Sequence, residues 1–353
     1  MRIASATRGG WMNLKLSVIV GIFGGFAFAI CLFVYFGLEP IGRAFAAAGW
    51  SGLAALCGVH VFSVVLCALA WQALLAQGPG AMLAFVWARW LRDSAGNLLA
   101  VLPAAGEMIA ARELSFHAIA LSLAGATTIV DLTIEIVSQL LFTLIGLGLL
   151  LAQRPGADGA WWALAGLLLA ALVVTGFVYL QRNGLYRLVH KLPVQHGLRR
   201  RFERLVEVAR IDAAIRQIYR HPARIAASTM LHLAGWVVAA AETWLGLKLM
   251  GHPLSFIDAL VVESLVFALR TTAFVVPWAA GVQEGGYLML GAVFGLQPEV
   301  SLALALLKRA REAVVGLPAL LIWQGLEWRR FLQGSGRFWR RMPASADICE
   351  PHS

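Results

Sequence analysis

Charged side chains are scarce in this sequence of 353 residues. They make up 14% of the chain, against about a quarter in an ordinary soluble domain. Hydrophobic residues account for 60%, and the mean hydropathy is +0.75. So few charges cannot cover the surface of a soluble protein of this length. The scarcity excludes most classes of soluble enzyme and indicates an all-α polytopic membrane protein.

Motifs that bind cofactors or metals are missing as well. The four cysteines, Cys31, Cys57, Cys67 and Cys349, form no C-x-x-C pair, so we expect neither a disulfide framework nor a metal site. The sequence holds no phosphate-binding loop, no nucleophile elbow and no H-E-x-x-H motif. We therefore expect no cofactor and no enzyme activity in this chain.

Long apolar stretches are abundant, and about 20 residues of helix cross a membrane. Eight stretches are long enough: Leu16–Leu38, Trp50–Leu75, Ala84–Leu102, Ala118–Leu151, Trp161–Leu180, Ile225–Met250, Phe256–Val276 and Leu302–Trp323. The net charge of +10 collects at the N-terminus, in segment 182–224 and in the tail 327–353, and Lys and Arg are enriched on the cytoplasmic side. We therefore place both termini in the cytoplasm of a bacterial cell, on its inner membrane. An even number of crossings must separate each basic region from the next. Five stretches lie between the N-terminus and segment 182–224, and three lie between that segment and the tail. One stretch in each interval therefore cannot cross.

Two of the eight stretches are expected to be re-entrant hairpins. Ala84–Leu102 contains three charged residues and ends at Pro103, and Phe256–Val276 contains several more and ends at Pro277. The fold prediction is therefore about six transmembrane helices plus two re-entrant helical hairpins. Such backbone is tolerated at membrane depth only where protein or a wet cavity surrounds it, so the hairpins imply a cavity.

A pattern recurs in the two halves of the chain. A stretch with His60 precedes V-L-P-A-A-G-E, which ends at Glu107, and a stretch with His232 precedes V-V-P-W-A-A-G-V-Q-E, which ends at Glu284. The topology orients the halves oppositely, so we expect an inverted repeat, which is typical of transporters with a site between the repeats. Chance is the alternative, because Pro and Gly are common in membrane helices. The predicted hairpin tips are Pro103, Gly106, Pro277 and Gly281.

The chain is expected to form one integral membrane domain. Its parts are a first helix and loop at 1–49, repeat one at 50–181 with its hairpin at 84–116, a basic amphipathic segment at 182–224, repeat two at 225–326 with its hairpin at 256–296, and a tail at 327–353. The Arg-rich face of segment 182–224 should bind anionic membrane lipids on the cytoplasmic leaflet. Nucleic acid is not an expected partner, because no aromatic residues interleave with the basic face. A homodimer and an association with lipid-biosynthesis enzymes are both open.

Charges inside the membrane cost about 2.5–3.5 kcal/mol each on insertion scales and need a compensating role. The candidate substrate-binding residues are Glu107, Arg112, Arg270, Glu284, Arg309 and Arg311. For Glu107 and Glu284 the alternative is that they cap the hairpin arms. Arg309 and Arg311 are expected to be ion-paired at rest and to bind an anionic lipid group during transport.

Two carboxylates and two histidines complete the candidates. Asp131 and Glu135 are four residues apart and share one helix face. Their alternative role is ion pairing with a basic helix, for which Leu302–Trp323 is the natural partner. His60 and His232 are candidates for proton coupling, since histidine titrates near neutral pH. The simpler alternative for both is a hydrogen bond to a neighbour.

Three short motifs resemble the membrane region of lysylphosphatidylglycerol synthases. They are P-A-A-G-E-M-I-A-A-R-E-L at Pro103–Leu114, P-W-A-A-G-V-Q-E-G-G at Pro277–Gly286, and L-K-R-A-R-E at 307–312. The length, the Arg-rich middle and the missing synthase domain are more similar to the stand-alone, hopanoid-biosynthesis-associated branch. The resemblance implies a flippase-like membrane domain without aminoacyl transfer. At the second tip the family usually has P-G-G-x-G-x-x-E. Here Trp278 and Ala279 replace two glycines, so less backbone is available to bind a phosphate. The bulky indole of Trp278 suits a rigid polycyclic lipid.

The function expected from the sequence is lipid transport. A flippase would move a polar-headed lipid, a hopanoid or a phospholipid, through a cavity between the repeats. One alternative is a membrane-embedded transferase in which Asp131 and Glu135 supply a base and orientation. Another is a non-catalytic accessory subunit in lipid, and specifically hopanoid, biosynthesis.

Overall fold

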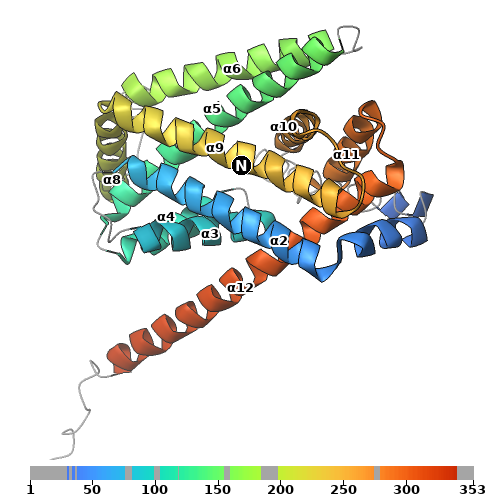
Figure 1. Cartoon of the computed structure of the whole chain (residues 1–353). Coiled ribbons are helices and arrows are strands. Elements are labelled where there is room, and N and C mark those ends of the chain that lie inside the picture. The colour runs from blue at the N-terminus through green and yellow to red at the C-terminus, as the bar shows by residue number, and fades with distance from the viewer. Residues whose placement is uncertain are drawn as a thin grey trace, which may run out of the picture.

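The computed structural model describes residues 30–31, 34–35, 38–75, 82–98, 104–117, 119–154, 160–183, 198–273 and 279–339, and every regular element within them is a helix. Their bounds are α2 Leu38–Ala73, α3 Met82–Leu98, α4 Ala105–Ser115, α5 Leu121–Gln153, α6 Ala160–Asn183, α8 Leu198–Tyr219, α9 Pro222–Leu249, α10 Phe256–Thr272, α11 Val282–Val293 and α12 Pro298–Trp339. Figure 1 shows this arrangement. The all-α prediction is confirmed.

Within the part of the chain that the structure describes, four helices are long and apolar enough to cross a membrane. The segments are Ile41–Ala73, Leu121–Gln153, Leu164–Arg182 and Pro222–Leu249, and each overlaps a predicted crossing. The polytopic class is therefore confirmed. The predicted crossing at Leu16–Leu38 lies almost wholly outside the described residues. The crossing predicted at Leu302–Trp323 is part of α12. This helix is not among the four because it carries more charged side chains than they do.

The segment before the first of these crossings differs from the prediction of a loop up to residue 49. Helix α2 begins at Leu38 and bends at Gly49, whose φ of 61° is left-handed. Ile41 and Ala48 are buried in a core with α9 and α12, and the alanine-rich sequence at 46–48 favours a helix. The loop prediction is wrong because this short piece has both helix propensity and an apolar face to bury.

The two predicted hairpins appear as two helix pairs. In the first pair α3 packs on α4, and in the second pair α10 packs on α11. The first arm of each has 17 residues, or about 26 Å, which is shorter than the roughly 30 Å of a bilayer core. At Gly106 a Cβ atom would lie 2.5 Å from the Arg92 carbonyl oxygen, so only glycine lets α4 approach α3 this closely. Pro103 and Pro277 lie outside the described residues, and the re-entrant path stays a prediction.

Helices α2 and α9 run antiparallel along each other (Figure 1). Gly52 near the start of α2 lies against Leu249 at the end of α9, and Gly246 lies against Leu56. Further along both helices the Ser63 hydroxyl donates to the Gly235 carbonyl oxygen over 3.3 Å. The two helices therefore form a central pair that crosses near the middle of both.

The helices that follow α2 and α9 pack in matching ways. Helix α3 packs on α2 and α12, while α10 packs on α9 and α5; α4 packs on α5, and α11 packs on α12. Close helix contact between α5 and α10 is set by Gly146, where any Cβ atom would collide with the Ser264 side chain. The first hairpin is thus held between the helices of its own half and α12 of the second half. The second hairpin is held between the helices of its own half and α5 of the first half.

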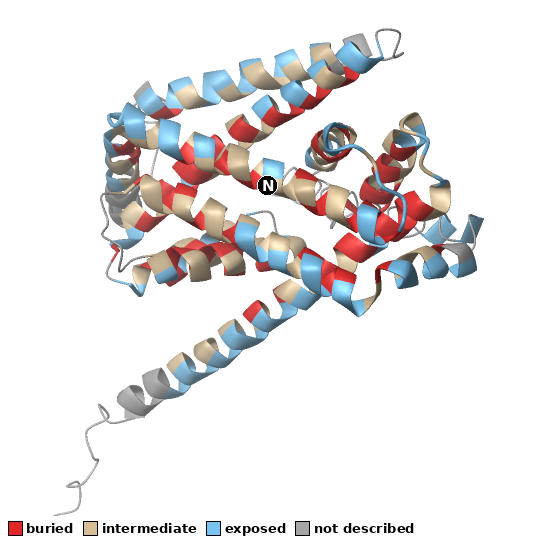
Figure 2. Ribbon diagram, in the orientation of Figure 1, coloured by how far each residue is buried: buried red, intermediate tan, exposed pale blue. Residues whose placement is uncertain are grey.

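Helices α6 and α8 lie outside this core. Figure 2 shows α6 exposed along most of its length, as expected for a helix surrounded by lipid. In α8, Ile215 and Ile218 are buried against the cluster that includes α3, α4 and α5. The apolar side of this basic helix therefore packs on protein, whereas we expected it to lie on the leaflet. Lipid binding by its Arg-rich side stays a prediction.

Candidate functional site

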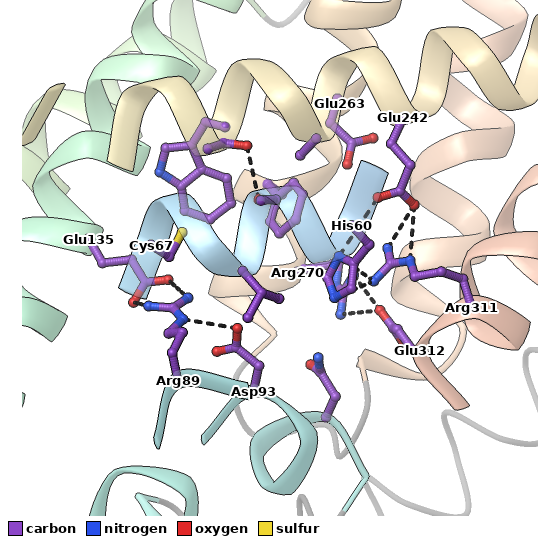
Figure 3. A pocket seen from close by; sticks show the side chains of 17 residues that line it. His60, Cys67, Arg89, Asp93, Glu135, Glu242, Glu263, Arg270, Arg311 and Glu312 are labelled. Atoms are coloured by element: carbon purple, nitrogen blue, oxygen red, sulfur yellow. Dashed lines mark hydrogen bonds and ion pairs between the residues drawn. The ribbon is translucent and has the colours of Figure 1, made fainter. Parts of the chain in front are cut away.

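A polar cavity of about 190 Å³ lies between the two halves (Figure 3). Helices α2, α3, α5, α9, α10 and α12 all contribute to its wall. The titratable side chains that line it are His60, Cys67, Arg89, Asp93, Glu135, Glu242, Glu263, Arg270, Arg311 and Glu312. Because charged groups are costly inside a membrane, their concentration at one cavity marks it as the candidate site.

The first ion cluster consists of Arg89, Arg92, Asp93, Glu107, Asp131 and Glu135. Arg89 donates twice to Glu135, over 2.9 and 2.6 Å, and once to Asp93 over 2.9 Å. Arg92 donates to Asp131 over 2.7 Å and to Glu135 over 2.8 Å. Asp131 and Glu135 do share a helix face, and the basic helix that they face is α3. Our choice of Leu302–Trp323 as their partner is wrong.

His232 belongs to the same region. Its Nε2 atom lies 3.0 Å from Asp131 Oδ1, and both side chains are fully buried. Within the described part of the chain, its Nδ1 atom has no hydrogen-bond partner. Asp131 therefore lies between a histidine on α9 and an arginine on α3, and it joins the two halves.

The second ion cluster consists of Glu242, Glu263, Arg270, Glu284, Lys308, Arg309, Arg311 and Glu312. Lys308 Nζ lies 2.6 Å from Glu263 Oε1, and the Tyr287 hydroxyl donates to Glu263 Oε2 over 2.7 Å. Thr243 also donates to this carboxylate. Lys308 of α12 is thus held by α10.

Arg311 and Arg270 face the cavity from the side of the second half (Figure 3). Arg311 binds Glu242 with contacts of 3.0 and 2.9 Å and approaches His60 Nδ1 to 3.0 Å. Arg270 donates to Glu312 over 3.4 Å, the longest of these pairs. Arg311 is therefore ion-paired at rest, as expected, and His60 contacts a cation.

The two tip carboxylates both contact arginines. Glu284 Oε2 accepts the backbone N–H of Gly281 over 2.8 Å, and its Oε1 accepts from Arg309 Nε over 3.0 Å. Glu284 therefore caps α11, which was the alternative role, and at the same time pairs with Arg309. Glu107 lies 3.5 Å from Arg92 Nε. The positive end of α11 is already occupied by a side chain of this protein.

Comparison with known proteins adds the family. The model described as the lysylphosphatidylglycerol synthase TM region matches residues 17–319. The chain belongs to this family. Neither a curated protein nor a solved structure matched. Membership connects the chain with a lipid-related function in a membrane, as the three motifs indicated, and it does not distinguish the hopanoid-associated branch.

Of the six substrate-binding candidates in this lysylphosphatidylglycerol synthase TM region, Arg270 and Arg311 line the cavity, and the other four do not. Arg112 is half exposed and donates to Glu327 over 2.9 Å. Next to it, buried Glu113 accepts from Arg330 over 2.6 Å, and the Arg330 guanidinium stacks on Phe116 at 3.9 Å. These contacts join α4 to the last part of α12. Arg112 therefore belongs to neither ion cluster, whereas the other five substrate-binding candidates do.

This α4–α12 contact lies outside the membrane-spanning segments, and its charges shift one another's titration. A hydrogen bond from Arg112, assisted by Arg330, holds the pKa of Glu327 below its ordinary value of 4.5. The hydrogen bond to Glu113 raises the pKa of Arg330. Both shifts favour the charged forms, so the contact is an ion pair at neutral pH.

Several residues of the site were not singled out from the sequence. Arg89 and Arg92 entered only as a reason why their stretch does not cross, and Glu242, Glu263 and Glu312 received no firm role. The signal was present, because each is a charge within an apolar stretch. Among the described residues no group of three His, Cys, Asp or Glu is placed to hold a metal ion.

Proposed function

We propose that this protein is a lipid transporter that moves a polar-headed lipid, a hopanoid or a phospholipid, between the leaflets of the bacterial inner membrane. The observation that carries the proposal is the cavity of about 190 Å³ between the halves, lined by charges from both. Ligand pockets for whole drug-sized molecules measure about 300–1,000 Å³. The cavity thus has room for a head group, while the apolar part of the lipid stays in the bilayer.

An inverted repeat is supported by the contacts of the central pair. Ser63 and Gly235 are 172 positions apart and touch each other. The same offset relates two further pairs on the cavity wall, Val64 with Trp236 and Cys67 with Ala239. Equivalent positions can line one cavity from antiparallel helices only if a two-fold axis passes close to it. Alternating access between inverted repeats uses this arrangement.

Opposite charges occupy corresponding places in the two halves. Arg89 and Glu263 are separated by the same 174 positions as the two hairpin prolines, and Asp131 and Lys308 by the same 177 positions as Glu107 and Glu284. In the first half Arg89 faces Asp131 at 3.7 Å, and in the second half Glu263 faces Lys308 at 2.6 Å. An entering head group therefore meets donors and acceptors on both sides.

The ion pairs supply a mechanism for admitting a polar group. Opening an ion pair in a membrane is costly unless a ligand replaces the lost partner. A lipid phosphate would replace Glu312 at Arg270, and the released carboxylate would turn to another donor of the second ion cluster. Arg270 is the natural entry point because its contact with a carboxylate is the longest of the three arginines that line the cavity, and its side chain is 19% exposed against 7% for Arg89 and Arg311.

Lipid exchange in vesicles tests the proposal. The full chain is reconstituted with fluorescent phospholipids or a hopanoid analogue, and the loss of outer-leaflet label to a membrane-impermeant quencher is followed. Wild type should exchange lipid faster than protein-free vesicles. Arg270→Met should slow exchange about tenfold, since a charged hydrogen bond contributes about 1.5–3 kcal/mol.

A matched control uses Arg112→Met, which removes an arginine that lies outside the cavity. This variant should exchange lipid at the wild-type rate. Absence of exchange with every lipid tested would reject the proposal. Equal slowing by both variants would reject the cavity as the route.

A further inference from the structure

We infer that His232, held by Asp131, is the proton-binding site that couples transport to proton movement, and that His60 is not. The inference rests on the proposed lipid transport and adds its energy source. Two histidines occupy related places in the halves, 172 positions apart. Their surroundings in the structure are opposite, and this difference assigns the role to one of them.

The imidazole of His232 has a free position for a proton. Its Nε2 atom is 3.0 Å from Asp131 Oδ1, so in the neutral form Nε2–H donates to the carboxylate. The Nδ1 lone pair then has no nitrogen or oxygen donor among the residues that the structure describes. The Cys67 thiol, which lines the cavity, lies beside the ring. His232 itself is fully buried behind the cavity wall, so a proton that enters the cavity reaches Nδ1 past the Cys67 thiol.

The carboxylates of Asp131 and Glu135 on α5 favour the cationic form of His232. Arg89 and Arg92 on α3, which pair with these carboxylates, oppose it. The first ion cluster as a whole has two arginines against four carboxylates, whereas the second ion cluster has four cations and four carboxylates. Asp93 and Glu107 are partly exposed, at 23% and 28%, and an excess of negative charge at membrane depth is still costly. A proton on His232 offsets part of that excess, whereas the second ion cluster needs no further charge.

His60 is in the opposite situation. Arg311 Nη1 lies 3.0 Å from its Nδ1 atom and 3.3 Å from its Nε2 atom. A guanidinium group is only a donor, so the His60 ring must offer a lone pair to it. Lys308 and Arg89 also act on His60, and Glu242 is more distant at 3.8 Å. A proton on His60 would place two cations in contact, so this histidine stays neutral.

The coupled step moves only a proton. Water on one side of the membrane delivers it through the cavity to Nδ1, and the same N–H bond breaks when the proton leaves to water on the other side. While His232 is a cation, it satisfies Asp131, and Arg92 becomes available to Glu107 or to a lipid phosphate. Proton binding thereby loosens the contact between α3 and α5 that keeps the first half closed.

A pH gradient across vesicles tests the coupling. The full chain is reconstituted with fluorescent phospholipid and a pH-sensitive dye, and the lipid distribution between leaflets is measured with and without the gradient. One pH unit changes a proton-coupled equilibrium about tenfold, so wild type should shift the leaflet ratio by up to about that factor. His232→Gln keeps an amide donor near Nε2 but binds no proton. Whatever the exchange rates of the two variants, the gradient should not change the leaflet ratio in His232→Gln and should still shift it in His60→Gln.

Each outcome decides the matter. Exchange by wild type that no pH gradient shifts would overturn the coupling and leave the proposed transport intact. A response to a sodium gradient instead would overturn the proton, and loss of the response in both variants would overturn the assignment to His232. No exchange by wild type would remove the proposed function itself.

A measurement on wild type covers the case in which His232→Gln does not fold. NMR of the protein with ¹⁵N-labelled histidine should show one buried imidazole that gains a proton as the pH is lowered and another that stays neutral. Protonation of the His60 ring ahead of His232 would contradict the inference.

Discussion

Ser63 on α2 and Gly235 on α9 meet at the wall of the central cavity, where the serine hydroxyl donates to the glycine carbonyl over 3.3 Å. The two residues are 172 positions apart and belong to antiparallel helices. Their contact therefore fixes the place where the halves of the molecule join. The ion clusters lie on either side of it, and both reach the same cavity (Figure 3).

The buried pair between Lys308 and Glu263 should be important for stability. Lys308→Met leaves the Glu263 carboxylate, which is 1% exposed, without its cation. Loss of one partner of a buried ion pair costs about 3–5 kcal/mol, so the melting temperature in detergent should fall strongly. The double variant Lys308→Met/Glu263→Gln should recover much of the loss. A single variant as stable as wild type would contradict the role of this pair.

The close approach of α5 to α10 should depend on Gly146. A Cβ atom at this position collides with Ser264, and overpacking costs about 1–3 kcal/mol. Gly146→Ala should therefore destabilise the protein in thermal unfolding. Gly148→Ala is the matched control, because it lies on the same helix with open space around it. Equal effects of the two changes would show that helix propensity decides the outcome, and packing does not.

The contact between α4 and the end of α12 should weaken in acid. Because the pKa of Glu327 is lowered in the folded state, its ion pair stabilises the contact above its ordinary pKa of 4.5, and this stabilisation is lost as the pH falls through the folded-state value. Hydrogen exchange of the α12 backbone near Glu327 should increase below that pH. In Glu327→Gln this part of α12 should exchange faster at neutral pH and show little further change in acid.

The sequence predicted the helices better than their partners. Hydropathy located the apolar stretches, and charge parity singled out two of them as stretches that do not cross. In the structure these two stretches are α3 and α10, the first helices of the two short pairs. The partner of Asp131 was wrong, because spacing along a helix determines which residues share a face and says nothing of which helix lies opposite. Arg112 was grouped with the cavity for a similar reason: its closeness to Glu107 in sequence does not reveal that it points to Glu327.

The cavity between the halves is the central claim, and blocking it is the most direct test. Gly235 lines the cavity, and a Cβ atom there would already lie 3.1 Å from the Cys67 sulfur. Gly235→Leu therefore fills space that a head group needs, whereas Gly58→Leu adds the same side chain at an open position on α2. Leaflet exchange of fluorescent lipid should fall about tenfold or more in Gly235→Leu, which corresponds to at least about 1.4 kcal/mol in the barrier, and should stay at the wild-type rate in Gly58→Leu. Wild-type exchange by a correctly inserted Gly235→Leu variant would contradict the account.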